Sequence, residues 1–169
     1  MKLINNLFRA ITLFSSRLAI WFTLLFFFVT SNIFATDYTI TVTAAGNSNY
    51  IFNSSGLQFT DSNDPDISVN VGDKLIFDAT SNTLASHPFA IVSQLNSSNG
   101  YSSSNEVSGV TNNGENGVLI TWDLTGVTPG EYFYVCVNHP EMRGKITVNA
   151  VTSGTDSDND GVADDVDVD

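Results

Sequence analysis

A thiol, an imidazole and a thioether follow one another at three-residue intervals late in the chain, at Cys136, His139 and Met142. His87 is the only other histidine in the sequence. Two imidazoles and one thiolate, with a weakly bound thioether, form the ligand set of a blue-copper electron-transfer centre. We therefore expect these four residues to bind one mononuclear copper ion.

This donor set favours copper over zinc. Cu(II) favours imidazole and Cu(I) favours soft sulfur, so a mixed site serves both oxidation states with little movement. A structural zinc site is usually closed by four strong cysteine or histidine ligands, and a thioether is a poor fourth ligand for zinc. The choice of side chains therefore indicates a redox metal.

Cys136 is the only cysteine, which excludes an intramolecular disulfide. An inert buried thiol is the simplest alternative for a lone cysteine. For the whole set, the alternative is a group of packed core residues in a sandwich that has lost its metal. The spacing of the three later ligands between two expected strands, with an imidazole at the start of another, favours the metal.

Alternation of apolar and polar residues predicts the strands that position these ligands. No stretch after residue 35 has an apolar repeat of 3.6 residues that is long enough for a substantial helix. The expected fold class is all-β, a sandwich. The strands are expected at residues 38–43, 67–71, 74–78, 89–92, 118–124, 131–137 and 145–148.

The connections between these strands also leave a signal. Gly72 and Asp73 predict a short link between two strands. Residues 94–117 are rich in serine, asparagine and glycine, which predicts a long surface loop with room for one short strand or turn.

On the strand expected at 131–137, alternation places Tyr132, Tyr134 and Cys136 on one face, so the sulfur points toward what that face buries. The loop that follows then curls back around the same point. Tyr132 is interpreted as a structural corner tyrosine rather than a redox relay. Three further aromatic residues are interpreted as core or inter-sheet packing: Phe77, Trp122 and Phe133.

With these motifs in view, the chain resembles the cupredoxin (blue copper) family over residues 38–149. The loop Cys136-x-x-His139-Pro140-x-Met142 is similar to the short ligand loop of amicyanins, and the chain as a whole looks plastocyanin-like. The resemblance implies a Greek-key β-sandwich with one type 1 copper at one end. It also implies that His139 is the ligand nearest solvent, through which electrons pass.

Two positions depart from the family pattern. Many cupredoxins have an asparagine after the first histidine, and its backbone N–H donates to the cysteine sulfur, whereas Pro88 has no N–H. Amicyanin and plastocyanin have proline two residues after the cysteine, where this chain has Asn138. We hypothesise that the thiolate hydrogen-bond donor has moved to the backbone of Asn138.

The first 35 residues read as an export signal. Lys2, Arg9 and Arg17 precede an apolar run from Leu18 to Val29, and cleavage after Ala35 leaves Thr36 first. An uncleaved membrane anchor is the alternative, although the run is shorter than the roughly 20 residues of a spanning helix. Cleavage leaves three basic and 18 acidic residues, a charge of 3 − 18 = −15, which argues against a nucleic-acid partner.

Residues 36–150 then form one domain, and residues 151–169 form a linker and an Asp-rich repeat. The repeat has the spacing of a calcium-binding loop and resembles the repeats of thrombospondin type 3 arrays. Such repeats occur in series, which suggests a fragment of a longer protein; a solvated, disordered acidic tail is the alternative. The candidate calcium ligands are Asp156, Asp158, Asp160, the carbonyl of Val162, Asp164 and Asp167.

The expected function is one-electron transfer by an exported copper protein in the periplasm, outside the cell or on its surface. The expected partner is a redox protein that docks around His139 and Pro140, where Arg143 and Lys145 are the nearest basic residues in sequence. No nucleic acid, no membrane after signal removal and no second subunit are expected. The alternative is a copper-holding or structural module of a larger exported protein. A multicopper oxidase or nitrite reductase needs further histidines that the chain lacks.

Overall fold

The structure is a computed structural model that describes residues 35–98 and 100–151. The expected signal peptide, apart from its last residue, and the expected calcium ligands lie outside the described residues. Within the described part of the chain, no helix has the length and apolar character needed to cross a membrane.

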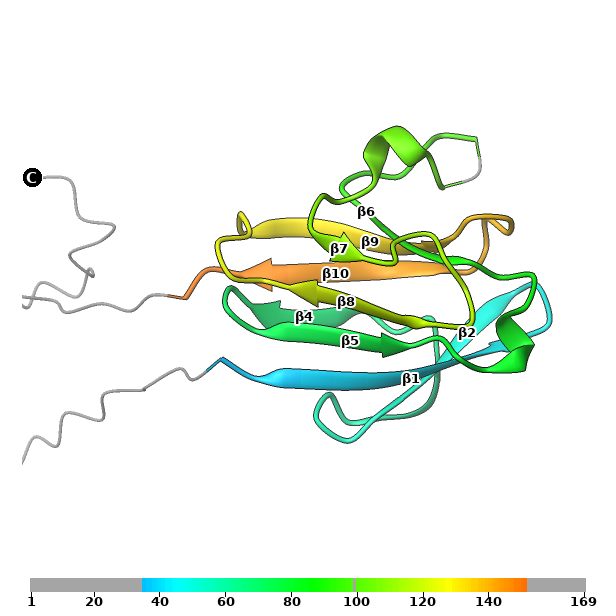
Figure 1. Ribbon diagram of the computed structural model, residues 1–169, viewed down its shortest axis with the longest axis horizontal. Coiled ribbons are helices and arrows are strands. Elements are labelled where there is room, and N and C mark those ends of the chain that lie inside the picture. Colours follow the sequence, from blue (N-terminus) through cyan, green and yellow to red (C-terminus); the bar gives the residue numbers. More distant parts are fainter. Residues whose placement is uncertain (1–34, 99, 152–169) are drawn as a thin grey trace, which may run out of the picture. The chain divides into compact units, whose positions relative to one another are not determined.

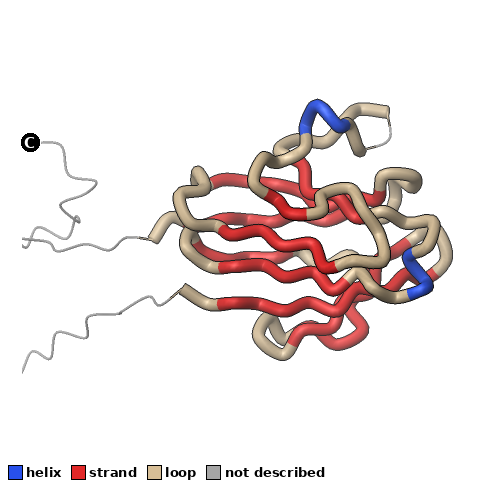
Figure 2. Tube along the Cα trace, in the orientation of Figure 1, coloured by secondary structure: helices blue, strands red, loops and turns tan. Residues whose placement is uncertain are grey.

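The described residues form two β-sheets, which overlap in the view of Figure 1 and are coloured by secondary structure in Figure 2. The first sheet has the order β3-β2-β1-β5-β8-β7. Its strands are β1 (Asp37–Ala45), β2 (Asn49–Ser54), β3 (Phe59–Asn63), β5 (Lys74–Asp78), β7 (Val110–Thr111) and β8 (Leu119–Asp123). The second sheet has the order β4-β10-β9-β6, formed by β4 (Ile67–Asn70), β6 (Phe89–Val92), β9 (Gly130–Cys136) and β10 (Arg143–Asn149).

Both sheets are mixed, because β1 pairs parallel with β5 and β4 pairs parallel with β10, while the other pairs are antiparallel. The only helices in the described residues are two 3₁₀ turns, η1 (Asn82–Leu84) and η2 (Ser103–Asn105). The all-β sandwich predicted from the sequence is therefore confirmed.

The core lies between the sheets, and alternation along each strand fills it. In β5, Leu75 and Phe77 are fully buried while their neighbours are half-buried. Trp122 joins the same core, as predicted, whereas Phe133 faces outward. An aromatic cluster spans the two sheets next to the end of β9, with Tyr50 and Phe52 from one sheet and Phe89 and Tyr134 from the other.

All seven predicted strands are present, with ends that differ by at most two residues. The sequence interpretation missed β2 and β3, and β7 lies in the segment that was expected to be a loop. The short link at residues 71–73 is confirmed, but the strands it joins, β4 and β5, lie in different sheets. The link therefore crosses the sandwich edge instead of forming a hairpin.

The side chain of Asp73 stabilises the link between β4 and β5. Gly72 has φ of +91°, a conformation that side chains disfavour. Asp73 is 2% exposed, and its carboxylate accepts hydrogen bonds from the backbone N–H groups of Asn70 and Thr36, each at 2.8 Å. The turn thereby ties the start of β1 to the end of β4.

The segment between β6 and β7 covers the edge of β6 and is drawn above β9 in Figure 1. Val107 N donates to Ile91 O at 3.0 Å. The Asn113 side chain accepts from Ile91 N at 2.7 Å and donates to Ile91 O at 3.0 Å. A small second cluster packs on the outer face of this sheet and includes Tyr101 and Phe133. The predicted long loop therefore protects a strand edge that would otherwise be open.

Candidate metal centre

Cys136 is the last residue of β9, and it is fully buried on the inner face that it shares with Tyr134. Its backbone pairs with Phe89 of β6. The loop that follows is closed at its base, because Cys136 N donates to Met142 O at 2.9 Å. Met142 N also donates to His139 O at 3.3 Å. These bonds bring the three ligand candidates of the loop back to one end of the sandwich.

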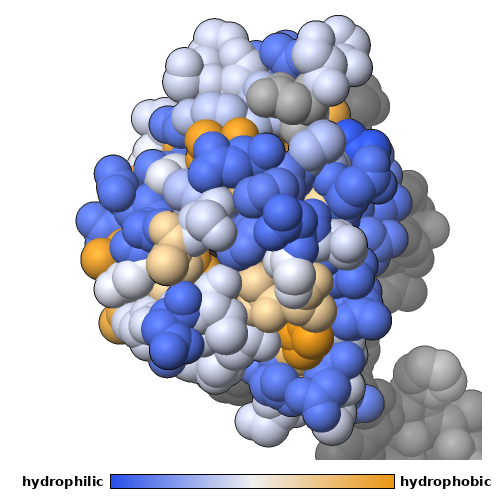
Figure 3. Space-filling view, turned by 90° about the vertical axis from the view of Figure 1, so that its right-hand side faces the viewer, coloured by the Kyte–Doolittle hydropathy of each residue, from blue (hydrophilic) through white to orange (hydrophobic). Residues whose placement is uncertain are grey.

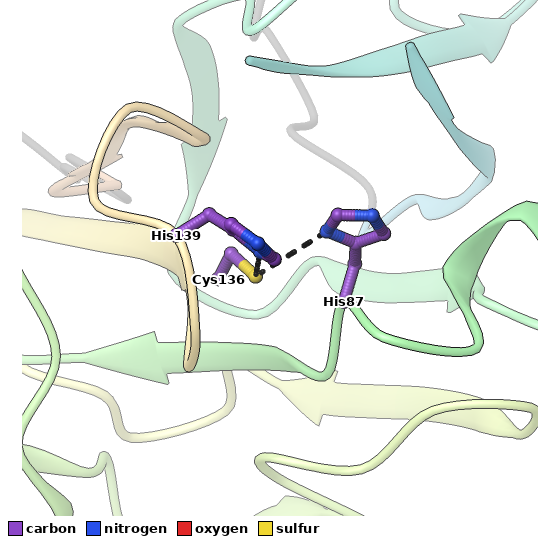
Figure 4. Close-up of side chains that lie close together, drawn as sticks. All are labelled: His87, Cys136 and His139. Atoms are coloured by element: carbon purple, nitrogen blue, oxygen red, sulfur yellow. Dashed lines mark hydrogen bonds between the residues drawn. The ribbon is translucent and has the colours of Figure 1, made fainter. Parts of the chain in front are cut away.

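His87 comes from a different part of the chain, two residues before β6. It is 4% exposed, and its backbone N–H donates to Leu84 O at 2.9 Å. This short turn after η1 points the imidazole back over the end of the sandwich toward the β9–β10 loop (Figure 4).

The two imidazoles and the thiol converge. Cys136 Sγ lies 3.9 Å from His87 Nδ1 and 3.6 Å from His139 Nδ1. The ligand atoms of all three residues lie within 4.8 Å of one another, and the imidazole centroids are 4.6 Å apart. Figure 4 shows both rings directed at the sulfur. The structure therefore brings together three of the four ligands expected from the sequence.

These distances suit a single metal ion. Ligand bonds of about 2.0–2.3 Å at roughly 120° to one another separate the donor atoms by about 3.5–4.0 Å. The two measured distances from sulfur to nitrogen fall at 3.6 and 3.9 Å. Two imidazoles and one thiolate in a plane are the strong ligands of a blue-copper centre. The residues present therefore fit copper.

Met142, the fourth expected ligand, is fully buried and belongs to the main core cluster. Its backbone bonds to Cys136 and His139 place it at the base of the same loop. A thioether held here without exposure to water suits the weak axial ligand of the set.

Electrostatics disfavours positive charge on the metal-free site. Burial lowers the pKa of His87, and the neighbouring His139 lowers it further. A neutral imidazole is the form that binds a metal. The pKa of Tyr50, whose hydroxyl lies beside the site, is raised far above its usual range, first by burial and then by the nearby Cys136. Tyr50 is therefore a neutral hydrogen-bond donor.

The ligands differ in their access to solvent. His139 is partly exposed, and its neighbours Asn138 and Pro140 are exposed, whereas Cys136 and Met142 are fully buried. Figure 3 shows this end of the molecule, where the surface is mostly hydrophilic with small apolar areas. The expectation that His139 is the ligand candidate nearest solvent is confirmed.

The structure does not contain the hydrogen bond proposed for Asn138. Among the described residues, no bond joins Asn138 N–H to Cys136 Sγ. The side chain of Asn138 instead donates to Ser86 O at 2.9 Å, while Val137 N donates to Pro88 O at 3.0 Å. Asn138 therefore links the two ligand-bearing loops without donating to the sulfur.

Sequence reasoning also missed the residues that hold the His87 segment. Asn116 Nδ2 donates to Leu84 O at 3.1 Å and to Ala85 O at 2.7 Å. Tyr50 donates to His87 O at 3.2 Å and to Pro88 O at 3.1 Å. The alternation of buried residues along β2 was a usable signal for Tyr50, but nothing in the sequence indicates its target.

Tyr132 has the structural role expected from the sequence. Its hydroxyl donates to Thr128 O at 2.8 Å, four residues earlier, as in the tyrosine corner of β-sandwiches. Its ring packs edge-on against Trp122 with centroids 5.0 Å apart. Tyr132 therefore closes the corner before β9.

The chain is similar to several solved copper proteins. A rusticyanin is 21% identical, with a TM-score of 0.42 over 68% of this chain and 78% of rusticyanin. Pseudoazurin from Hyphomicrobium denitrificans is 16% identical, with a TM-score of 0.40 over 67% of this chain and 75% of pseudoazurin. A Cu(I) amicyanin mutant is 19% identical, with a TM-score of 0.36 over 66% of this chain and 82% of amicyanin.

These three proteins are cupredoxins, the family that the sequence motifs resemble. At such identities and TM-scores the likeness carries no conclusion about function. No family model matches the chain, and no curated protein matches it.

Proposed function

We propose that this chain is an exported cupredoxin that binds one type 1 copper ion at His87, Cys136, His139 and Met142 and transfers single electrons. The observation that carries the proposal is the convergence of the sole thiol and both imidazoles within 4.8 Å. Bound copper supplies the chemistry by alternating between Cu(I) and Cu(II). The protein supplies a site whose shape suits both states.

Each of the four ligand residues has its own role in the proposed site. Cys136 ends β9 and His87 lies two residues before β6, and these two strands pair at this end of the second sheet, so the two ligands keep their separation when the charge at the site changes. Met142 is fully buried, so its thioether is kept away from water. His139, at the exposed rim, offers the shortest route for an electron to a partner. Because few groups move, reorganisation on electron transfer is small.

The proposed docking surface surrounds His139 and Pro140. Of the two basic residues near it in sequence, Lys145 pairs with Glu131 at 3.0 Å. Arg143 is exposed and forms no ion pair with any described residue. It is therefore the basic group available to a partner at this end, in a chain whose net charge is strongly negative. The partner is a redox protein, and export places the encounter in the periplasm, outside the cell or on its surface.

The test is the visible spectrum of the full chain after addition of Cu(II), followed by a redox titration. An intense blue thiolate-to-copper band that disappears and returns with reduction and oxidation is expected. In Cys136→Ser the band should be absent, and any Cu(II) that still binds does so at surface groups and gives no such band. A folded wild-type protein that takes up Cu(II) without the band would contradict the proposal.

The second candidate is a copper-holding or structural module within a larger exported protein. The spacing of the aspartates at positions 156–167 favours it, because calcium-binding repeats are structural units. Titration with Ca²⁺, compared between the full chain and a variant that ends at Val151, tests the repeat. Binding by both variants, or by neither, argues against it.

A further inference from the structure

Tyr50 reaches across the sandwich to the metal-binding segment. It belongs to β2 of the first sheet, whereas Cys136 and the strand after His87 belong to the second sheet. Its ring is fully buried against Phe89 and Tyr134, with centroid distances of 5.2 and 6.3 Å. Tyr50 therefore connects the first sheet to the end of the second sheet where the ligands lie.

Its hydroxyl binds the backbone that carries the ligand. It donates to His87 O at 3.2 Å and to Pro88 O at 3.1 Å. Among the described residues, Pro88 O has a second donor in Val137 N, whereas His87 O has no hydrogen-bond donor other than Tyr50. A buried carbonyl with one donor loses its hydrogen bonding completely when that donor is removed.

Tyr50 is itself held firmly. Its backbone N–H donates to Asp64 Oδ1 at 2.9 Å, and its carbonyl accepts from Asp64 N at 3.0 Å. The hydroxyl thus projects from a backbone fixed on both sides. Pro88 has no N–H, so the hydrogen bonds that hold it are accepted by its carbonyl, from Val137 N and from the Tyr50 hydroxyl.

We propose that Tyr50 is a positioning residue for His87, whose hydroxyl holds the His87 and Pro88 carbonyls and presets the imidazole toward Cys136 before a metal binds. The proposal deepens the proposed copper function and rests on it for its effect on metal affinity. Its structural part, the preset imidazole, concerns the metal-free protein alone.

The test compares Tyr50→Phe with Tyr134→Phe in the full chain. Tyr134 is an equally buried tyrosine whose hydroxyl donates to Pro65 O at 2.9 Å, so its variant also removes the hydrogen bond of a tyrosine hydroxyl, but not one to the ligand segment. Loss of a group that orients a metal ligand commonly costs about 10–100-fold in metal affinity. We expect that loss of copper affinity for Tyr50→Phe and little change for Tyr134→Phe.

A second measurement uses the metal-free protein. The chain has two histidines, so an isotope-labelled sample gives two imidazole signals, which His139→Gln assigns. We expect one sharp His87 signal in the wild type, a shifted or broadened one in Tyr50→Phe, and an unchanged one in Tyr134→Phe. A broad wild-type signal overturns the proposal without any variant having to fold. Equal signals in the two tyrosine variants also overturn it. A wild type that binds no copper refutes only the proposed function.

A second feature lies at the opposite end of the sandwich, at the start of β1. Asp73 is 2% exposed, and no described lysine or arginine pairs with its carboxylate. A buried carboxylate normally has a cationic partner. One of its oxygens lies 2.8 Å from the backbone nitrogen of Thr36, the residue that the signal-peptide pattern places first after cleavage.

We infer that leader removal supplies the missing cation. Hydrolysis of the Ala35–Thr36 bond by the signal peptidase of the exporting cell consumes one water and leaves a carboxylate on Ala35 and an ammonium on Thr36. That ammonium forms an ion pair with the buried Asp73 carboxylate. Processing therefore stabilises the exported fold. This inference rests on export and not on copper.

The test begins with the N-terminal sequence and intact mass of the exported chain, which should start at Thr36; another first residue overturns the inference. The unfolding equilibrium is then compared with that of a chain that retains Ala35. We expect the ratio of folded to unfolded protein to be about tenfold higher for the chain that starts at Thr36, because a hydrogen bond to a charged group is stronger than a neutral one. The advantage should vanish in Asp73→Asn. Equal stability of the two chains overturns the inference even if Asp73→Asn does not fold.

Discussion

Replacing Gly144 with alanine should destabilise the domain strongly, although a change from glycine to alanine normally stabilises a protein where the backbone conformation permits it. Gly144 lies in β10 opposite Tyr134 of β9. A Cβ at this position would overlap the Tyr134 hydroxyl and lie 2.5 Å from Cζ and 2.8 Å from Cε1 of the ring. Gly144 does not have a positive φ, so the backbone accepts alanine, which by itself adds about 0.4–1 kcal/mol of stability. The expected loss therefore comes from the clash with Tyr134 and from the contacts that this clash disrupts.

Neighbouring aromatic rings prevent the Tyr134 ring from moving away from an added Cβ. It stacks on Phe89 with centroids 5.6 Å apart and an interplanar angle of 11°, and it lies 4.9 Å from Phe52. Moving it also breaks the part-buried hydrogen bond from its hydroxyl to Pro65 O. Overpacking costs about 1–3 kcal/mol, and loss of the part-buried hydrogen bond to Pro65 O adds about 1 kcal/mol. We expect Gly144→Ala to lower the free energy of unfolding by about 2–4 kcal/mol.

Urea unfolding of a double-mutant cycle checks this reasoning. In Tyr134→Leu the ring is absent, so adding Gly144→Ala should cost much less than it does in the wild type. The steric explanation would be refuted by equal costs in the two backgrounds, or by a Gly144→Ala variant as stable as the wild type.

Three further results are expected. Burial raises the pKa of Asp64 to about 6 from 3.8, so its favourable contribution is complete below pH 3.8 and is lost as the pH rises through about 6. Asp64→Asn should flatten this part of the pH dependence of unfolding, and an unchanged curve would contradict the assignment. Met142→Leu should keep the blue band and raise the reduction potential, because an apolar side chain stabilises Cu(II) less than a thioether does; an unchanged potential would exclude Met142 as axial ligand. Asn138→Ala and Asn138→Pro should have equal potentials, since both lose the bond to Ser86 and the backbone N–H does not reach the sulfur; a shift in the proline variant alone would show a thiolate hydrogen bond.

The types and spacing of a few residues were enough to predict three of the four expected ligands as neighbours. Cys136 and His139 lie on one tight loop, so their proximity is a local property that sequence spacing expresses. Period-two alternation similarly predicted the strands that bury one face, such as β5 and β9. It failed at β3, whose residues are mostly polar and exposed.

Other features exist only in the folded chain. The position of His87 beside a sulfur 49 residues away was predicted only because the chain has no other histidine to pair with it. Two hydrogen bonds join residues 37 positions apart: one from the Tyr50 hydroxyl to the His87 carbonyl, and one from Thr36 N–H to the Asp73 carboxylate. Which carbonyl a hydroxyl reaches depends on how two sheets pack, and no local pattern encodes that packing. The sequence by itself therefore determined the ligand types and the strand faces, whereas the tertiary structure decided which groups orient them.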